Sequence, residues 1–221
     1  MPVMKIAVVS ANMGSFDPPP QHVPQSVEVD YHHFTDENYP RRECAMSPRL
    51  QARIPKLFAW QPGMAPGYDR YLWVDASLAL SSPDSVAWFL EQLGDHDMVF
   101  FRHPDRKSQR EEWDFIKGKI AAGNRYLTPR YRNEDGDGAL AEIEIDKNYE
   151  DDLLIATSAF MYKPMPKVQE LMKEWAYWIF RYHAVDQLGL PYALYGLDID
   201  YALIEEHYQK TGYLIPTRGK R

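Results

Sequence analysis

The sequence has one cysteine among its 221 residues, Cys44. A single cysteine excludes an intrachain disulfide and a zinc site built on several cysteines, and it is typical of a reducing compartment. No apolar run approaches the ~20 residues that a membrane-spanning helix requires. The apolar stretch near the N-terminus is interrupted by Lys5 and followed by Asn12, which is unlike a secretory signal. These absences predict a cytoplasmic protein without a membrane span.

Positive charge is also scarce. The 25 Lys and Arg residues are outnumbered by 32 Asp and Glu, which gives a formal net charge of −7. This balance disfavours non-specific attachment to nucleic acid or to an anionic membrane, although a local basic patch can act against it. Hydrophobic residues make up 45% of the chain and there is no low-complexity tract, which excludes a disordered protein. We therefore expect a soluble globular protein.

Several common catalytic motifs are missing as well. The first expected strand, 5–9, is followed neither by G-x-G-x-x-G nor by G-x-x-x-x-G-K-S/T, which excludes a dinucleotide fingerprint and a P-loop. There is no G-x-S-x-G elbow and no H-E-x-x-H zinc motif. The histidines are scattered, and the adjacent His32 and His33 would point to opposite faces of a strand. A dedicated zinc site is therefore not expected.

What is present is an alternation of strand and helix patterns. Short apolar runs predict strands, and amphipathic stretches opened by Ser-Pro or Ser predict helices between them. This order favours an α/β fold with a mainly parallel, mixed sheet covered by helices on both faces. The charged, Gly-rich stretch 128–138 predicts a mobile excursion, and 140–145 alternates like a hairpin arm. Without a repeat or long linker, 1–221 is expected to form one domain with an inserted excursion at 126–150.

The strand expected at 71–74 ends in Asp75. An acidic side chain at the carboxyl end of a buried strand lies where open α/β sheets bind ligands. Ala76 and Ser77 follow directly and leave room for a phosphate, a ribose or a metal ion. A simple turn cap explains Asp75 equally well.

The helix expected from Ser47 carries cations on one face. Arg49, Arg53 and Lys56 are spaced i, i+4 and i+7, which places them on the same side of a helix. Three cations on one face suggest an anionic ligand such as a diphosphate. A solvated helix face would show the same spacing.

Two further segments lie at expected ends of strands or helices. The first, after the strand at 98–101, contains His103 and Arg106 and continues to Glu111 and Glu112. The second, Asp186-Gln187, follows the long Trp-containing helix expected after Pro166. A surface charge cluster and a hydrogen-bonded turn are the plain structural alternatives.

Together these four elements resemble the glycosyltransferase-like proteins of the GT-A superfamily of the plant TOD1 and MUCI70 type. In that family a basic helix precedes Y-D-x-x-x-W-I/V-D-A/G, then H-P-x-R…E-E, then a Trp-containing helix ending in D-Q-L. The match runs from about Lys5 to Leu194. The metal-binding D-x-D of the wider superfamily is replaced here by Asp75-Ala76-Ser77. The literal D-x-D strings at 95–97, 135–137 and 198–200 fall before a strand, in the excursion and at an expected helix start, and are set aside.

The resemblance implies a single GT-A-like, Rossmann-like domain that moves a sugar from a nucleotide-sugar, with a UDP-sugar favoured, to a hydroxyl acceptor. The resemblance leaves the acceptor unidentified, and a glycan and a modified DNA base are the two candidates. An anionic acceptor is favoured by seven of the cations between 102 and 132, unless they pair internally with nearby acids. They are Arg102, Arg106, Lys107, Arg110, Arg125, Arg130 and Arg132. A non-catalytic sugar-nucleotide or glycan-binding module is the alternative, and a nucleotidyltransferase is disfavoured because its Gly-rich, Lys-containing loop is missing.

The resemblance also implies roles for single residues. The first-strand loop would hold the base, the basic helix the diphosphate, and the strand-end acid a ribose or a divalent Mn²⁺ or Mg²⁺ ion. A carboxylate near the anomeric carbon would act as base or stabilise the transition state. The donor-binding candidates are Ser10, Ala11, Asn12, Arg49, Arg53, Lys56, Asp75 and Ser77, with Asp75 also the metal ligand. The catalytic candidates are Asp186 and Gln187, then Glu111 and Glu112, with His103 and Arg106 on the acceptor side.

Overall fold

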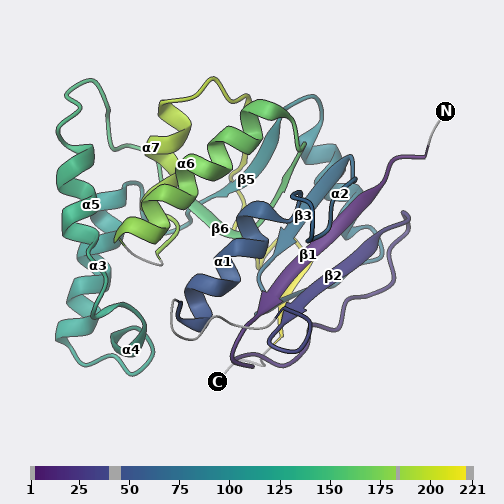
Figure 1. The fold of residues 1–221 in the computed structure, drawn as a ribbon, viewed down its shortest axis with the longest axis horizontal. Coiled ribbons are helices and arrows are strands. Elements are labelled where there is room, and N and C mark those ends of the chain that lie inside the picture. The colour runs from purple at the N-terminus through teal and green to yellow at the C-terminus, as the bar shows by residue number, and fades with distance from the viewer. Residues whose placement is uncertain (1–2, 40–45, 183–184, 218–221) are drawn as a thin grey trace.

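The computed structural model describes residues 3–39, 46–182 and 185–217. Cys44 lies outside these ranges, so the expectation attached to it has no structural counterpart. The centre of the molecule is a twisted sheet with helices packed on it, and a further layer of helices stands to one side (Figure 1). No helix in the described ranges combines the length and apolar character needed to cross a membrane.

The central sheet has six strands in the order β2-β1-β3-β6-β5-β7. Its pairings β1–β2, β1–β3 and β5–β7 are parallel, whereas β6 is antiparallel to both β3 and β5. Five strands therefore run in one direction and β6 runs against them, which confirms the predicted mainly parallel, mixed sheet. The strands are β1 (Ile6–Asn12), β2 (Asp30–Thr35), β3 (Arg70–Val74), β5 (Met98–Arg102), β6 (Ile155–Tyr162) and β7 (Tyr201–Ile204).

Both faces of this sheet are covered, because successive side chains of a strand point to opposite sides. Val9 and Trp73 belong to a core shared with α1 (Pro48–Phe58), α6 (Pro166–Tyr182) and α7 (Leu190–Tyr195). Their neighbours Val8 and Leu72 belong to a second core. That core is closed by α2 (Ser85–Leu93) and by the two-stranded sheet of β4 (Leu78–Leu80) and β8 (Leu214–Pro216).

The prediction of a hairpin arm at 140–145 is wrong. Residues 128–145 contain two helices, α4 (Thr128–Tyr131) and α5 (Gly136–Ile143), which stand beside α3 (Gln109–Ala121) (Figure 1). Asp135 caps α5 by accepting a hydrogen bond from the Gly138 amide at 2.9 Å. The apolar residues of this stretch were expected to alternate along a strand. On the helix they face aromatic side chains instead: Leu140 packs with Trp113 of α3, and Ile143 packs with Trp178 of α6.

Two strand boundaries and one expected helix start also differ from prediction. β1 runs to Asn12, so only residue 13 of the loop expected at 10–13 lies beyond the strand. β2 lies at 30–35 instead of the expected 27–31. The Ser10 hydroxyl is satisfied within the sheet, 2.7 Å from Nδ1 of His33. Asp198 and Asp200 precede β7 and not a helix, because the Asp200 amide donates to Asp97 Oδ2 at 2.8 Å across the sheet edge.

Candidate functional site

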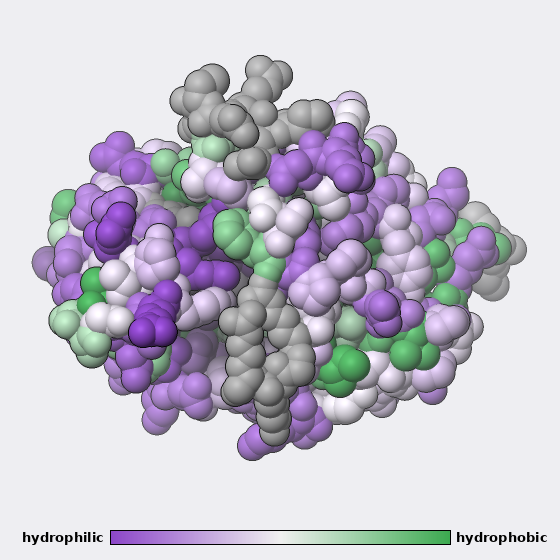
Figure 2. Space-filling view, turned by 90° about the horizontal axis from the view of Figure 1, so that it is seen from below, coloured by the Kyte–Doolittle hydropathy of each residue, from purple (hydrophilic) through white to green (hydrophobic). Residues whose placement is uncertain are grey.

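A cavity of about 320 Å³ opens where β1 and β3 end, beside the N-terminal half of α1. Figure 2 looks at the molecule from below in the sense of Figure 1, the side on which β1 and β2 end, and this face is coloured mainly hydrophilic. The carboxyl ends of parallel strands are the usual ligand-binding edge of an open α/β sheet. Polar and charged residues of the lining include Asn12, Arg49, Arg53, Asp75, Ser77, Arg130 and Ser158, and aromatic ones include Phe16, Trp73, Tyr126 and Tyr208.

Helix α1 places the three predicted cations on the side facing this cavity and the core beneath it. Its start is fixed by Ser47, whose hydroxyl accepts a hydrogen bond from the Leu50 amide at 3.3 Å. The side chain of Arg49 is 19% exposed, that of Arg53 16% and that of Lys56 0%. A solvated helix face is therefore excluded.

Lys56 lies beneath the cavity, without reaching its lining. Its ammonium group donates to the Thr157 carbonyl oxygen at 2.7 Å and forms an ion pair with Asp186. Asp75 Oδ1 is 3.7 Å from the same nitrogen. The rings of Trp73 and Trp175 lie 5.4 Å and 5.7 Å from it, within the range of cation–π attraction. The ammonium group is thus held from every side in a site closed to water.

Asp186 is the second buried member of this cluster. Its Oδ2 is 3.1 Å from a guanidinium nitrogen of Arg53 and also contacts Lys56. Burial by itself would raise the pKa of Asp186, but Arg53, Lys56 and hydrogen bonds from Lys56 and Thr157 outweigh it and lower the pKa to about 2. A carboxylate with so low a pKa is a poor proton acceptor near neutral pH. Asp186 was predicted to be the catalytic base. The geometry instead favours a role as a counter-ion that holds Arg53 and Lys56 in place.

Asp75 follows β3 and projects into the cavity with 30% of its side chain exposed. Its Oδ1 accepts a hydrogen bond from Trp73 Nε1 at 2.8 Å. The turn after the strand is closed by backbone groups, since the Leu78 amide donates to the Asp75 carbonyl oxygen at 2.8 Å. The carboxylate is therefore not used as a turn cap within the described residues. Ser77 stands beside it in the cavity lining.

Of the three donor-binding candidates on β1, two lie at the cavity and one does not. Ala11 and Asn12 line the cavity, whereas Ser10 is buried and bonded to His33. The Asn12 side chain holds the following loop, because its amide nitrogen donates to the Asp17 carbonyl oxygen at 2.7 Å. Asn12 thus shapes the rim next to Phe16.

The remaining predicted residues are outside the lining of this cavity. Arg106 pairs with Glu112, and the His103 Nδ1 accepts the Arg106 amide at 3.2 Å. Burial, followed by the charge of Arg106, lowers the pKa of His103 to about 4, so this ring is neutral at pH 7. Glu111 accepts the Lys107 amide at 2.7 Å, and Gln187 is half-buried next to Asp186. The fold does not bring these groups to the cavity wall.

Several cations between 102 and 132 pair with acids inside the molecule. Arg102 is 3.0 Å from Glu205, and Arg110 pairs with Glu144. Arg130 differs, because it lines the cavity with its guanidinium group 3.9 Å above the Tyr126 ring. Internal pairing therefore accounts for much of this basic stretch, and it gives no support to a nucleic-acid acceptor.

Part of the cavity comes from a segment near the C-terminal end of the described chain. Tyr208, Gln209 and Pro216 line it. They reach it because β8 pairs antiparallel with β4, directly after the turn at Asp75. No motif marks this segment, and only the pairing of two three-residue strands reveals it.

The residues present do not fit a divalent metal site. Across the ranges that the structure describes, no three His, Cys, Asp or Glu side chains come together to hold an ion. Mg²⁺ is usually held by one or two carboxylates together with substrate phosphates. Here Asp75 has Lys56 at 3.7 Å, and the nearby carboxylate of Asp186 is engaged by two cations.

Comparison of the sequence with protein-family models and with curated proteins finds no match. Among solved structures, the chain is similar to the galactosyltransferase LgtC in its crystal structure with donor and acceptor sugar analogues. The two share 12% sequence identity with a TM-score of 0.38, over 89% of this chain and 72% of that chain. At this level the likeness concerns the arrangement of helices and strands, and no residue role is drawn from it.

Proposed function

We propose that this protein is a glycosyltransferase that moves a sugar from a nucleotide-sugar, with a UDP-sugar favoured, to a hydroxyl of a glycan acceptor. One observation carries the proposal. The cavity at the carboxyl ends of β1 and β3 is lined by arginines, by Asp75 and Ser77, and by aromatic rings. This combination matches the charge and the stacking surfaces of a nucleoside diphosphate.

In this proposal each group has a stated task. Arg49, Arg53 and Arg130 face the diphosphate, and Asp75 accepts a hydrogen bond from a hydroxyl of the donor ribose. The bond from the anomeric carbon to the diphosphate oxygen breaks while a bond to the acceptor oxygen forms, and the proton of the acceptor hydroxyl passes to the leaving diphosphate. Negative charge then grows on the leaving diphosphate, so fixed guanidinium groups beside it stabilise the transition state more than the ground state.

Asp186 acts in this mechanism by holding two cations in place. It holds Arg53 in the wall and Lys56 beneath Asp75, which keeps both positive charges fixed before the donor arrives. A role as positioning residue also agrees with its burial and with its lowered pKa.

A non-catalytic sugar-nucleotide-binding module is the second candidate. It is favoured by the place of the predicted catalytic acids, since Asp186 is engaged by two cations and Glu111 and Glu112 are outside the lining. Such a module would bind the donor without breaking it. Binding and turnover must therefore be measured separately.

The test is calorimetric binding of UDP and GDP, together with donor hydrolysis and transfer over a panel of their sugars. Asp75→Asn keeps the volume but removes a charged acceptor, whose hydrogen bond contributes about 1.5–3 kcal/mol, so affinity should fall about 10- to 100-fold. Asp114→Asn, at an exposed acid on α3 paired with Lys117, is the matched control and should bind normally. Unchanged affinity in Asp75→Asn, or no binding of either nucleotide, would contradict the proposal. Tight binding without turnover would favour the module.

A further inference from the structure

We infer that this site neutralises the donor diphosphate with side-chain cations alone and binds its donor without a divalent ion. The inference rests on the proposed function and concerns how the same cavity handles charge. Its starting point is Asp75, the one predicted metal ligand. Its negative charge is already matched by cations that the fold holds in place.

Lys56 is the first of these cations. It is 3.7 Å from Asp75 Oδ1, and its side chain is fully buried. It is fixed by the Thr157 carbonyl oxygen at 2.7 Å and by Asp186. A divalent ion on Asp75 would sit close to an ammonium group that has no room to move away. Repulsion between these charges opposes binding of the ion.

The donor atoms for an ion are also few. Asp75 Oδ1 accepts a hydrogen bond from Trp73 Nε1 at 2.8 Å, which leaves mainly its other oxygen for a ligand. Two positions further along stands Ser77, a neutral hydroxyl in place of a second acid. Asp186 is held by Lys56 and by Arg53, 3.1 Å away, so it is not available either. The protein supplies roughly one carboxylate oxygen, the low end of the one or two carboxylates that usually hold Mg²⁺ beside substrate phosphates, and Lys56 lies 3.7 Å from that carboxylate.

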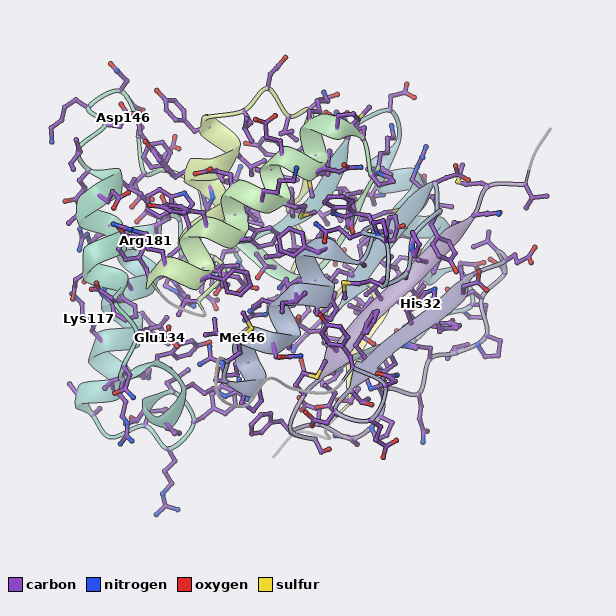
Figure 3. All side chains as sticks on the ribbon, viewed as in Figure 1. His32, Met46, Lys117, Glu134, Asp146 and Arg181 are labelled. Carbon is purple, nitrogen blue, oxygen red and sulfur yellow. The ribbon has the colours of Figure 1, made fainter. Side chains whose placement is uncertain are left out.

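Positive charge for the phosphates is supplied by three arginines of the cavity lining. Arg49, Arg53 and Arg130 all line the cavity, and a guanidinium group matches phosphate oxygens in a two-pronged arrangement. Arg49 is oriented by Glu134 at 3.6 Å, and its guanidinium lies 4.4 Å above the Tyr131 ring. Figure 3 labels Glu134 on the side of the outer helical layer facing Met46, just before α1. The arginine wall is thus built from two layers of the molecule and set before the donor binds.

The experiment is calorimetric titration of UDP into the protein in excess EDTA and again in millimolar Mn²⁺. The expected result is the same affinity in both buffers, within about twofold. Affinity that is tenfold or more tighter with Mn²⁺, or lost in EDTA, overturns the inference and leaves the proposed function standing. The same titrations are run with GDP, and if neither nucleotide binds in either buffer the proposed function falls and the inference falls with it.

Two variants sharpen this test. Arg130→Gln removes a half-buried rim cation and should weaken UDP binding in EDTA at least fivefold without lowering the melting temperature. Arg53→Gln removes a counter-ion of the buried acids, and Mn²⁺ should then restore part of the lost affinity, because acidic charge beside the phosphates is no longer matched. Arg181→Gln, at the end of α6 next to α5, is the control and should bind UDP normally (Figure 3). Wild-type affinity in Arg130→Gln and in folded Arg53→Gln would overturn the inference.

Discussion

At the scale of single residues, the structure turns on a buried set of charges. Lys56, Asp186 and Arg53 are brought together from α1 and from the segment after α6, with Asp75 at their edge. Removing charges from water is costly, and the attraction within such a group offsets that cost only while every partner is present. Loss of one partner therefore leaves an uncompensated buried charge.

Asp186 should make the stability of the protein depend on pH in a defined acidic window. Its pKa is lowered from 3.8 in the unfolded chain to about 2 in the folded one, so the folded state favours the ionised form. The resulting stabilisation, about 2 kcal/mol, is fully present above pH ~4 and is lost as the pH falls towards 2. Urea unfolding of the wild type and of Asp186→Asn at pH 6, 4 and 2.5 measures it.

The variant should be less stable by about 3–5 kcal/mol at pH 6, because it leaves Lys56 with a neutral partner. This difference should shrink by about 1.4 kcal/mol between pH 4 and 2.5, because over this range the unfolded chain takes up its proton while the folded carboxyl only begins to do so. A difference in the free energy of unfolding that stays constant over this range would show that Asp186 is not held ionised by its neighbours.

At the scale of elements, α5 is placed by its fit against α3. It begins at Gly136, and a Cβ added there would overlap the indole ring of Trp113. Trp113 is buried with Leu140 and Ile116 in a small core of its own. The absence of a side chain at Gly136 therefore allows α5 to pack closely against α3.

Gly136→Ala should lower the free energy of unfolding by about 1–3 kcal/mol, because the ring has to move out of a packed core. Gly118→Ala is the matched control, since an added Cβ at that position in α3 has nothing within 4 Å. The control should be neutral or stabilising by up to about 1 kcal/mol, because alanine is the better helix former. Urea unfolding of both variants decides, and equal stability of the two would contradict the packing of α5 on Trp113.

At the scale of the whole molecule, the cavity is assembled from distant parts of the chain. Asn12 and Asp75 come from strand ends, Tyr126 from the segment before α4, and Tyr208 from the segment before β8. A ligand in this cavity contacts all of them at once. Its binding energy should therefore stabilise the molecule as a unit.

UDP at about 100 times its dissociation constant should raise the free energy of unfolding by about 2.7 kcal/mol, which corresponds to roughly 5–10 °C in the melting temperature. Amide hydrogen exchange should slow in 126–130 and in 208–216 together, although these segments are far apart in sequence. Asp114→Asn should behave as the wild type in both measurements. A saturating nucleotide that changes neither the melting temperature nor exchange in these two segments would show that the cavity is not its binding site.

The amino-acid sequence by itself determined the elements whose signals are local. The apolar run 71–74 gave β3 with Asp75 at its end, and the Ser47-Pro48 cap gave the start of α1 with its three cations on one side. Strand periodicity, capping and helical spacing depend on neighbours within a few residues, so they can be read without the fold. The mixed, helix-covered sheet followed from the same alternation.

Only the tertiary structure decided what those residues do. Lys56 and Asp186 are 130 positions apart, and no local pattern shows that a face of cations is matched by a carboxylate from beyond α6. In the same way, short α5 was missed because its stability comes from packing against Trp113 and Trp178, and Tyr208 because it reaches the cavity only through β8. Burial and charge pairing are properties of groups brought together by the folded chain, and they turned a basic helix face into one wall of a cavity.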